Sequence, residues 1–424
     1  SDTAEGIFAL GAVKRVLCLM AVQPLVAQAF RELMSWRWGA SIFCESLQAL
    51  GVASCITVQD AQNRIERGIV IGVSPESSHA DIAPAANRVL QSTDRLLVLA
   101  DSRKEVIVDF DPLLANIQSG LKSVMRPGLT RRLSGPVGSA AHHTDGRRQT
   151  SAEATIVVIV GWPTDADDIL SFLDDYIERG SVVEILAPMA EEERQRRLSH
   201  SRGFQGRNCE IRHRVGSTTS LFALSGLPLN EASAVLVLAD HSLHEDPRLS
   251  DSANVAACVT IDGLLEGRHP ELFKPSTGRG RPRLICEVLS AETDRALGSS
   301  SAKDSALTRL DVFQTSALEA ALFTIASIQA PVFNCFVQLL RRSNDFGEFL
   351  SVSAQAYLKD RSDTGMVGIE VLRELVRQAG DVFLGYFPEH SIAPTVLPVK
   401  RPELTVSADV RLLVITKRAE DLEL

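Results

Sequence analysis

The chain has 424 residues, more than a single hydrophobic core usually holds, so we expect two or three domains. An apolar content of 45% is typical of globular proteins and not of disordered ones, and a net charge of −9 argues against a dedicated nucleic-acid surface. The seven cysteines have no CxxC pair and no metal-ligand spacing, which indicates a reducing compartment. The first residue is Ser and not Met, so we expect a processed or truncated piece.

The first part of the chain is expected to be helical up to about residue 50. Two apolar helical patterns, Phe8–Met20 and Val22–Met34, are separated at Pro24. A β-rich stretch follows, with short apolar strands at Val70–Val73 and Asp94–Ala100. We therefore predict a module of helices followed by strands at residues 1–110.

A basic segment comes next, and we predict a flexible linker at residues 111–154. The stretch Pro112–Thr150 holds six Lys or Arg against one acidic residue, together with many Gly and Pro. Such a tract could bind an acidic partner or anionic lipid, but a solvated linker is favoured because nothing apolar anchors it.

The central domain is predicted to begin with the buried strand Ile156–Val160, which runs into a Gly-Trp-Pro turn and then a helical pattern. Strands and helices alternate from there to about Leu297, which predicts a doubly wound α/β domain with a parallel sheet. The predicted strands are Ile156–Val160, Val182–Leu186, Cys209–Val215, Ala234–Ala239 and Leu284–Leu289. The predicted helices are Asp167–Arg179, Ala190–Ser199, Thr218–Leu224 and Val255–Glu266.

The last part of the chain repeats the first. Two helical patterns at Ala317–Ile328 and Val332–Arg341 come first. Because Glu319, Gln329 and Pro331 interrupt the apolar stretch, a pair of packing helices is a better interpretation than a membrane span. Then Val382–Pro394 parallels Ile69–Pro84, and a second apolar strand follows at a matching distance. This order predicts an internal duplication.

The turn after the first central strand does not favour a dinucleotide. It offers only Gly161, while Trp162 would fill the space of the phosphates, and Asp165 and Asp168 would repel them. We expect these four residues to shape a cleft or a contact between subunits. No catalytic constellation can be assembled, and we predict no catalytic residue.

An acidic segment follows the fourth central strand, at the edge where open α/β sheets bind ligands. Its candidate ligand residues are Asp240, Glu245, Asp246 and Asp251. Clustered carboxylates could hold Ca²⁺, with Asp240 and Asp251 as the metal ligands. The alternative is a solvated loop in which Asp251 caps a helix that begins near Ser252.

Several short motifs resemble the cytosolic region of CASTOR/POLLUX-type ion channels. They are the Gly-Trp turn with its acids from Ile159 to Ile169, the Ser225–Leu229 segment, the Val235–Asp240 strand and the Asp251-Ser252 pair. The family pattern usually has a basic pair where this chain has Pro163-Thr164, and an acid in place of Ser290.

The resemblance implies two RCK domains, each with a Rossmann-like half, a helical crossover and a small β-rich half. Residues 1–110 would be the later part of the first RCK domain, 155–300 the Rossmann-like half of the second, and 301–424 its crossover and β-rich half. The family implies a gating region of a cation channel that forms a tetrameric ring below an upstream pore, on the cytosolic or nucleoplasmic side of a nuclear-envelope membrane. The alternatives are a nucleotide-dependent oxidoreductase and a stand-alone soluble scaffold.

Overall fold

The computed structural model forms two compact units. It describes residues 2–35, 40–75, 80–107, 154–200, 204, 206–240, 246–276, 280–299, 310–340, 347–358, 365–389, 391, 394–396, 401 and 403–417. Unit 1 comprises residues 1–12, 24–124 and 320–424, and unit 2 comprises residues 13–23 and 125–319. The predicted linker lies outside the described residues except for its last position, and the predicted boundaries near 110, 154 and 300 stay predictions.

Unit 2 is built on a six-stranded sheet in which every neighbouring pair of strands is parallel. The strand order is β10-β9-β8-β5-β6-β7, so the order reverses beside β5, as in doubly wound folds. The strands are β5 (Ile156–Val160), β6 (Ser181–Ala187), β7 (Cys209–Val215), β8 (Ala232–Val237), β9 (Arg283–Val288) and β10 (Asp311–Gln314). The predicted α/β fold class is therefore confirmed.

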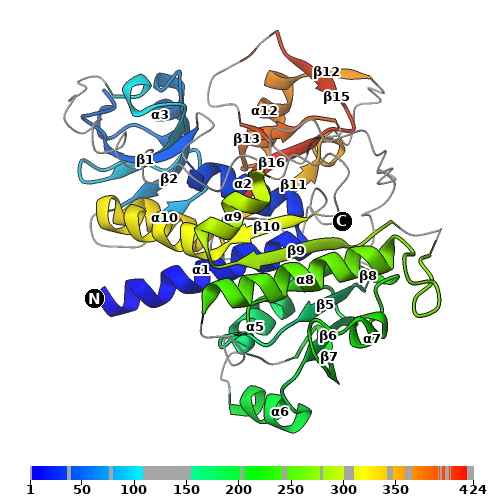
Figure 1. Cartoon of the computed structure of the whole chain (residues 1–424). Coiled ribbons are helices and arrows are strands. Elements are labelled where there is room, and N and C mark those ends of the chain that lie inside the picture. The colour runs from blue at the N-terminus through cyan, green and yellow to red at the C-terminus, as the bar shows by residue number, and fades with distance from the viewer. Residues whose placement is uncertain are drawn as a thin grey trace. The chain divides into compact units, whose positions relative to one another are not determined.

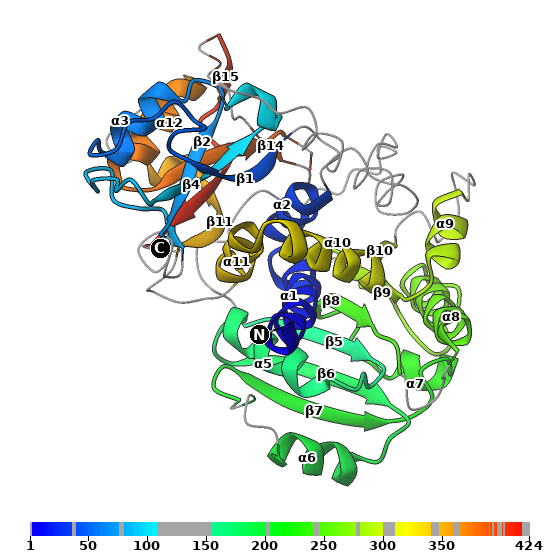
Figure 2. The ribbon, with the colours of Figure 1, turned by 90° about the vertical axis from the view of Figure 1, so that its left-hand side faces the viewer.

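Helices cover both faces of this sheet. The helices of unit 2 are α5 (Ala166–Tyr176), α6 (Glu191–His200), α7 (Leu221–Ser225), α8 (Pro247–Leu265) and α9 (Ala291–Ser299), with parts of α1 (Asp2–Val22) and α10 (Thr315–Ile328). One face packs Val158 and Val160 against α7 and α8 (Figure 1). On the other face lie α5 and α1 (Figure 2), which are joined where Cys18 Sγ approaches Ile169 O at 3.6 Å.

Unit 1 contains two antiparallel sheets with the same topology. The first has the order β1-β4-β2-β3 and the second has the order β11-β16-β13-β14. The strands of the first are β1 (Ser41–Ser46), β2 (Ile69–Ser74), β3 (Asp81–Ile82) and β4 (Arg95–Ala100). Those of the second are β11 (Glu348–Ser353), β13 (Val382–Phe387), β14 (Thr395–Val396) and β16 (Arg411–Thr416). A further strand pair joins β12 (Met366–Gly368) to β15 (Thr405–Ser407).

The duplication extends to the register of the strands. In the first sheet the pairing of β2 with β4 shifts between Val70 and Gly72, and in the second the pairing of β13 with β16 shifts between Phe383 and Gly385. A side chain at Gly385 would meet Thr395 O at 2.1 Å, and one at Gly72 would meet Asp81 O at 3.0 Å. Both glycines therefore allow a short third strand to approach a bulge closely.

The helices of unit 1 pack on these sheets. They are α2 (Pro24–Ser35), α3 (Val58–Arg64), α11 (Ala330–Leu339) and α12 (Ile369–Gln378). Both α2 and α11 contact β1 as well as β11, and the rings of Phe30 and Phe349 lie 4.8 Å apart. A capping box between Thr57 and Asp60 starts α3. Among the described helices, none has the length and apolar character that crossing a bilayer requires.

Some element predictions were wrong. Residues 41–46 form β1 and not part of a helix, and the short strands β10 and β11 were missed. Helix α8 begins eight residues before the predicted Val255, because Asp246 caps it and Pro247 occupies its first position. Asp251 therefore lies inside this helix and does not cap it.

Candidate functional site

The candidate site lies at the carboxyl edge of the parallel sheet, where β5 turns into α5. Gly161 begins this turn with φ +109°, and its N–H donates to Leu186 O at 2.9 Å. A Cβ atom at this position would meet Leu238 O at 2.3 Å. The close approach of the chain after β8 thus requires a glycine here, and the N–H is already used within the fold.

Trp162 is buried in the same turn, beside two groups from neighbouring elements. The guanidinium of Arg194, from α6, lies 6.0 Å from the centre of the Trp162 ring. The ring of His213, from β7, lies 6.4 Å from it at an interplanar angle of 52°. Burial, followed by the charge of Arg194, lowers the pKa of His213 below its ordinary value.

Arg194 attaches α6 to the sheet. Its side chain is fully buried, and it donates to Ile185 O at 3.2 Å and to Arg214 O at 2.9 Å. These carbonyls lie near the carboxyl ends of β6 and β7. Among the described residues, no carboxylate forms an ion pair with Arg194, and its Nε has no hydrogen-bond partner. A buried cation, and not an apolar face, therefore holds this helix.

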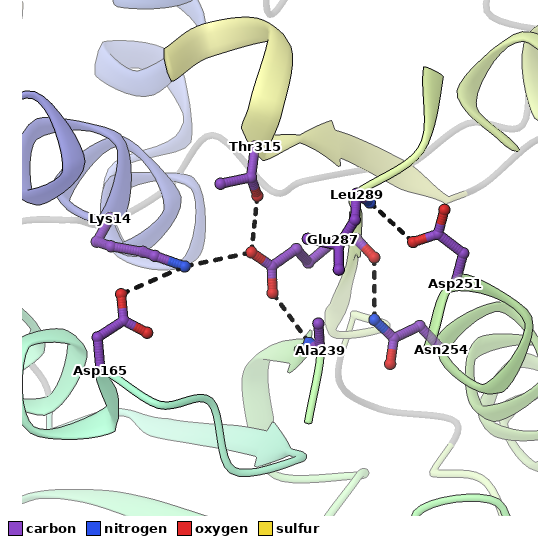
Figure 3. Close-up of polar contacts among 8 residues, drawn as sticks. All are labelled: Lys14, Asp165, Ala239, Asp251, Asn254, Glu287, Leu289 and Thr315. Carbon is purple, nitrogen blue, oxygen red and sulfur yellow. Dashed lines mark hydrogen bonds and ion pairs between the residues drawn. The ribbon is translucent and has the colours of Figure 1, made fainter. Parts of the chain in front are cut away.

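A buried carboxylate, Glu287 on β9, joins several elements at this edge (Figure 3). It is 1% exposed. Its Oε1 accepts a hydrogen bond from Thr315 Oγ1 at 2.7 Å and lies 3.3 Å from Lys14 Nζ, and its Oε2 accepts from Ala239 N at 2.9 Å. The carbonyl of Glu287 accepts from Asn254 Nδ2 at 3.0 Å. One side chain thus ties β9 to α1, to α10 and to the segment after β8.

Lys14 supplies the cation of this cluster. Its Nζ also lies 3.4 Å from Asp165 Oδ2, so two carboxylates share one ammonium group (Figure 3). Burial by itself would lower the pKa of Lys14, but the attraction of Glu287 and Asp165 outweighs it, and the pKa is raised. Burial also raises the pKa of Glu319 on α10, which Lys14 partly offsets and Glu287 reinforces. Lys14 is therefore held in its charged form.

The side chain of Asp251 accepts hydrogen bonds from the backbone and so has a structural role. It is fully buried inside α8, and one of its carboxylate oxygens accepts a hydrogen bond from Leu289 N at 2.7 Å (Figure 3). The other accepts from Ser290 N at 2.9 Å. The carboxylate therefore satisfies backbone donors just after β9 ends. The bonds fix the segment after β9 to α8, next to Glu287.

The other residues predicted from the sequence do not form one group. Asp240 is buried after β8, Asp246 caps α8 by accepting from Arg248 N at 2.9 Å, and Glu245 lies outside the described residues. Asp168 is on the first turn of α5, where partial burial and the charges of Asp167 and Asp165 raise its pKa. In the described part of the chain, no three acidic, His or Cys side chains lie close enough together to hold a metal ion. The calcium site stays a prediction.

Sequence reasoning missed the centre of the site. Glu287 stands in an otherwise apolar strand, and Lys14 stands beside Arg15 in a largely apolar helical pattern. A charge inside a buried pattern indicates a partner elsewhere, because a lone buried charge is costly. The two residues are 273 positions apart, so no spacing rule could have paired them.

Comparison with known proteins shows that the chain is similar in sequence to several ion channels. No family model matches the chain. The chain is 24% identical over 280 residues to the ion channel DMI1 of Medicago truncatula, covering 65% of this chain and 28% of that protein. It is 24% identical to the probable ion channel POLLUX of Oryza sativa subsp. japonica, covering 62% and 28%, and 22% identical to the ion channel CASTOR of Lotus japonicus, covering 54% and 28%. The chain thus spans under a third of the length of these relatives.

Among solved structures, the chain is similar to the gating ring of human SLO3. The TM-score is 0.56 with 12% sequence identity, and the match covers 96% of this chain and 75% of that one. At this identity the likeness concerns the fold, and it supports the predicted arrangement of a Rossmann-like sheet with two small β-rich modules. The chain therefore has the fold of a channel gating ring, and the predicted resemblance to CASTOR/POLLUX-type ion channels is confirmed over about 65% of its length.

Proposed function

We propose that this chain is the cytosolic regulatory region of an ion channel, in which ligand binding shifts an equilibrium between conformations and so acts on a pore. The observation that carries the proposal is the sequence similarity to the channels DMI1 and POLLUX, which extends over 62% to 65% of the chain. The likeness of the whole fold to a gating ring supports the same conclusion. A ligand does this only if it binds one conformation more tightly than the other.

The Glu287 cluster supports a route for such a shift. Lys14 lies on α1 and Thr315 lies on α10, and both contact the carboxylate of Glu287. Residues 2–12 of α1 and 320–328 of α10 belong to unit 1, while the remainder of each helix belongs to unit 2. A ligand that alters the carboxyl edge of the sheet would therefore act on two helices that continue into the other unit.

We propose further that the chain assembles with copies of itself into a ring, as the channel gating region would require. Sedimentation velocity at increasing protein concentration tests this directly. A tetramer or larger closed species is expected. A chain that stays monomeric up to about 100 μM, well above the dissociation constants of stable assemblies, would contradict ring assembly.

The channel proposal itself needs the full-length product of the gene, in which a pore would lie upstream of this chain. Recording currents from that product in a lipid bilayer is the test, with Glu287→Gln as the perturbing variant. The exposed Arg212→Gln serves as the matched control, because its described ion pair lies within β7. Ion currents whose open probability changes with the first variant and not with the second are expected. A product that conducts no ions would refute the proposal.

We propose Ca²⁺ as a ligand of the regulatory region. The alternative function, a nucleotide-dependent oxidoreductase, would require a nucleotide such as NAD to bind. Calorimetric titration of the chain with Ca²⁺, NAD(H), NADP(H) and ATP separates the regulatory reading from the oxidoreductase. Ca²⁺ that binds the native state raises the midpoint of thermal unfolding, and Asp240→Asn should reduce that rise. Asp251 is a poor probe here, because its loss would break two backbone hydrogen bonds whether or not an ion is bound.

A further inference from the structure

A cleft of about 530 Å³ lies in unit 2 between α6 and the turn that follows β5. One of its walls is a single face of α6, since Glu193, Arg196, Arg197 and His200 follow one another at helical spacing. The opposite wall consists of the turn at Trp162 and the start of α5. The volume falls in the range of sites for small molecules.

The α6 wall carries more positive than negative charge. Glu193 is the one carboxylate on this wall, and it pairs with both arginines, with Arg197 Nε at 2.9 Å. Their side chains are 67% and 50% exposed, so both guanidinium groups keep donors free to face the cleft. The pairing lowers the pKa of Glu193, which keeps this carboxylate ionised and shared.

A third guanidinium, that of Arg194, lies near the cleft but is not among the residues that line it. It is 6.0 Å from the centre of the ring of Trp162, which lines the cleft. Arg194 is fully buried, and its Nε has no hydrogen-bond partner among the described residues. Its positive charge adds to the charges of Arg196 and Arg197 on α6. The N–H of the glycine turn offers no free donor, because it is bound to Leu186 O.

The far wall limits what else the ligand can be. Asp167 lines it, and its carboxylate favours hydrogen-bond donors over a second anionic group. A ligand with one phosphate group toward α6 and hydroxyl groups toward Asp167 would match both walls. Guanidinium groups bind phosphate oxygens in a forked geometry, which suits a pair of adjacent arginines.

We propose that this cleft binds a phosphate monoester of a polyhydroxylated molecule, with Arg196 and Arg197 as its phosphate ligands and Asp167 as an acceptor for its hydroxyl groups. A soluble sugar phosphate and the headgroup of a phosphorylated inositol lipid share this chemistry. The residues that line the cleft differ from those of the Glu287 cluster, although Asp165, which pairs with Lys14, stands between the lining residues Thr164 and Ala166 in the chain. The proposal does not rest on the channel function, because binding can be measured on the chain by itself.

Calorimetry with glucose 6-phosphate, inorganic phosphate and glucose tests the proposal, with vesicles that contain a phosphatidylinositol phosphate as the lipid arm. Glucose 6-phosphate should bind and glucose should not. The double variant Arg196→Gln, Arg197→Gln should bind glucose 6-phosphate at least about tenfold more weakly, since charged hydrogen bonds are lost. The matched control Arg212→Gln, an exposed arginine on β7, should bind as the unmodified chain does.

The lipid arm identifies the source. Binding to the vesicles that the double variant loses, without binding of the soluble ester, supports a lipid headgroup, and the reverse supports a soluble metabolite. Failure of every phosphate probe at millimolar concentration would overturn the proposal, as would a double variant that binds as tightly as the unmodified chain. The fluorescence of Trp162 gives a second readout. Equal melting midpoints without ligand would show that the double variant folds.

Discussion

The buried pair of Lys14 and Glu287 makes a quantitative prediction. Lys14→Met keeps most of the side-chain volume but removes the ammonium from a carboxylate that is 1% exposed. Removing one partner of a buried ion pair usually costs about 3–5 kcal/mol. Glu287 keeps its hydrogen bonds from Thr315 and Ala239 N, so we expect the lower end of the range, about 3 kcal/mol of the free energy of unfolding.

The assay is urea unfolding followed by the fluorescence of Trp162, in a background in which Trp36 and Trp38 are Phe. Because Trp162 belongs to unit 2, its signal reports the unit that holds the pair. The free energy should be taken from this transition alone, since a chain of two units need not unfold in one step. In the control Arg212→Met, an exposed pair is lost, and the transition should hardly move, because exposed ion pairs contribute little to stability.

A double variant gives a further test of the reasoning. The double variant Lys14→Met, Glu287→Gln should recover much of the loss, because no unpaired charge then stays buried. A loss no larger than that of Arg212→Met, or a double variant no better than the single one, would refute the role assigned to this pair.

Three other outcomes are expected. Because the pKa of His213 is lowered in the fold, the unfolded chain binds more protons than the folded chain below about pH 6.5. Stability should therefore decrease as the pH falls below this value, and His213→Gln should flatten this part of a profile of melting midpoint against pH. An unchanged profile would contradict the prediction. Asp251→Ala should cost about 1–3 kcal/mol in the Trp162 transition, because two buried N–H groups lose their acceptor; a neutral effect would show that water replaces it. Gly385→Ala should lower the melting midpoint of unit 1 more than Gly72→Ala, since its Cβ would meet a backbone oxygen at 2.1 Å and not 3.0 Å; the reverse order would be inconsistent with these contacts.

The parallel sheet was predictable because its central strands β5, β6, β8 and β9 are apolar and largely buried, whereas the edge strand β7 is mostly exposed. Ile156–Val160 and Cys209–Val215 were predicted with the bounds that the structure gives them. Of the strands that were missed, β10 is short and β1 lies in a stretch predicted to be helical. Both become strands through pairing with distant partners. Local pattern carries little information about such pairing.

The site was only partly predictable. Asp165 and Asp251 were singled out from the sequence. Asp165 lies 3.4 Å from Lys14 Nζ, and Asp251 accepts a hydrogen bond from Leu289 N near Glu287 (Figure 3). Their roles could not be predicted from the sequence. The residue type does not tell whether an acidic side chain lies in a solvated loop or accepts hydrogen bonds from buried backbone groups. Arg194 was missed for the same reason, since a charged helix such as α6 gives no sign of which cation is buried.

The two matching antiparallel sheets have a practical consequence. Each is a natural reference for the other, because equivalent positions such as Gly72 and Gly385 experience the same strand order with different neighbours. A substitution made in turn at both positions separates what the shared architecture demands from what one copy has since acquired. Features tolerated in one half and not in its counterpart would point to where the halves have specialised.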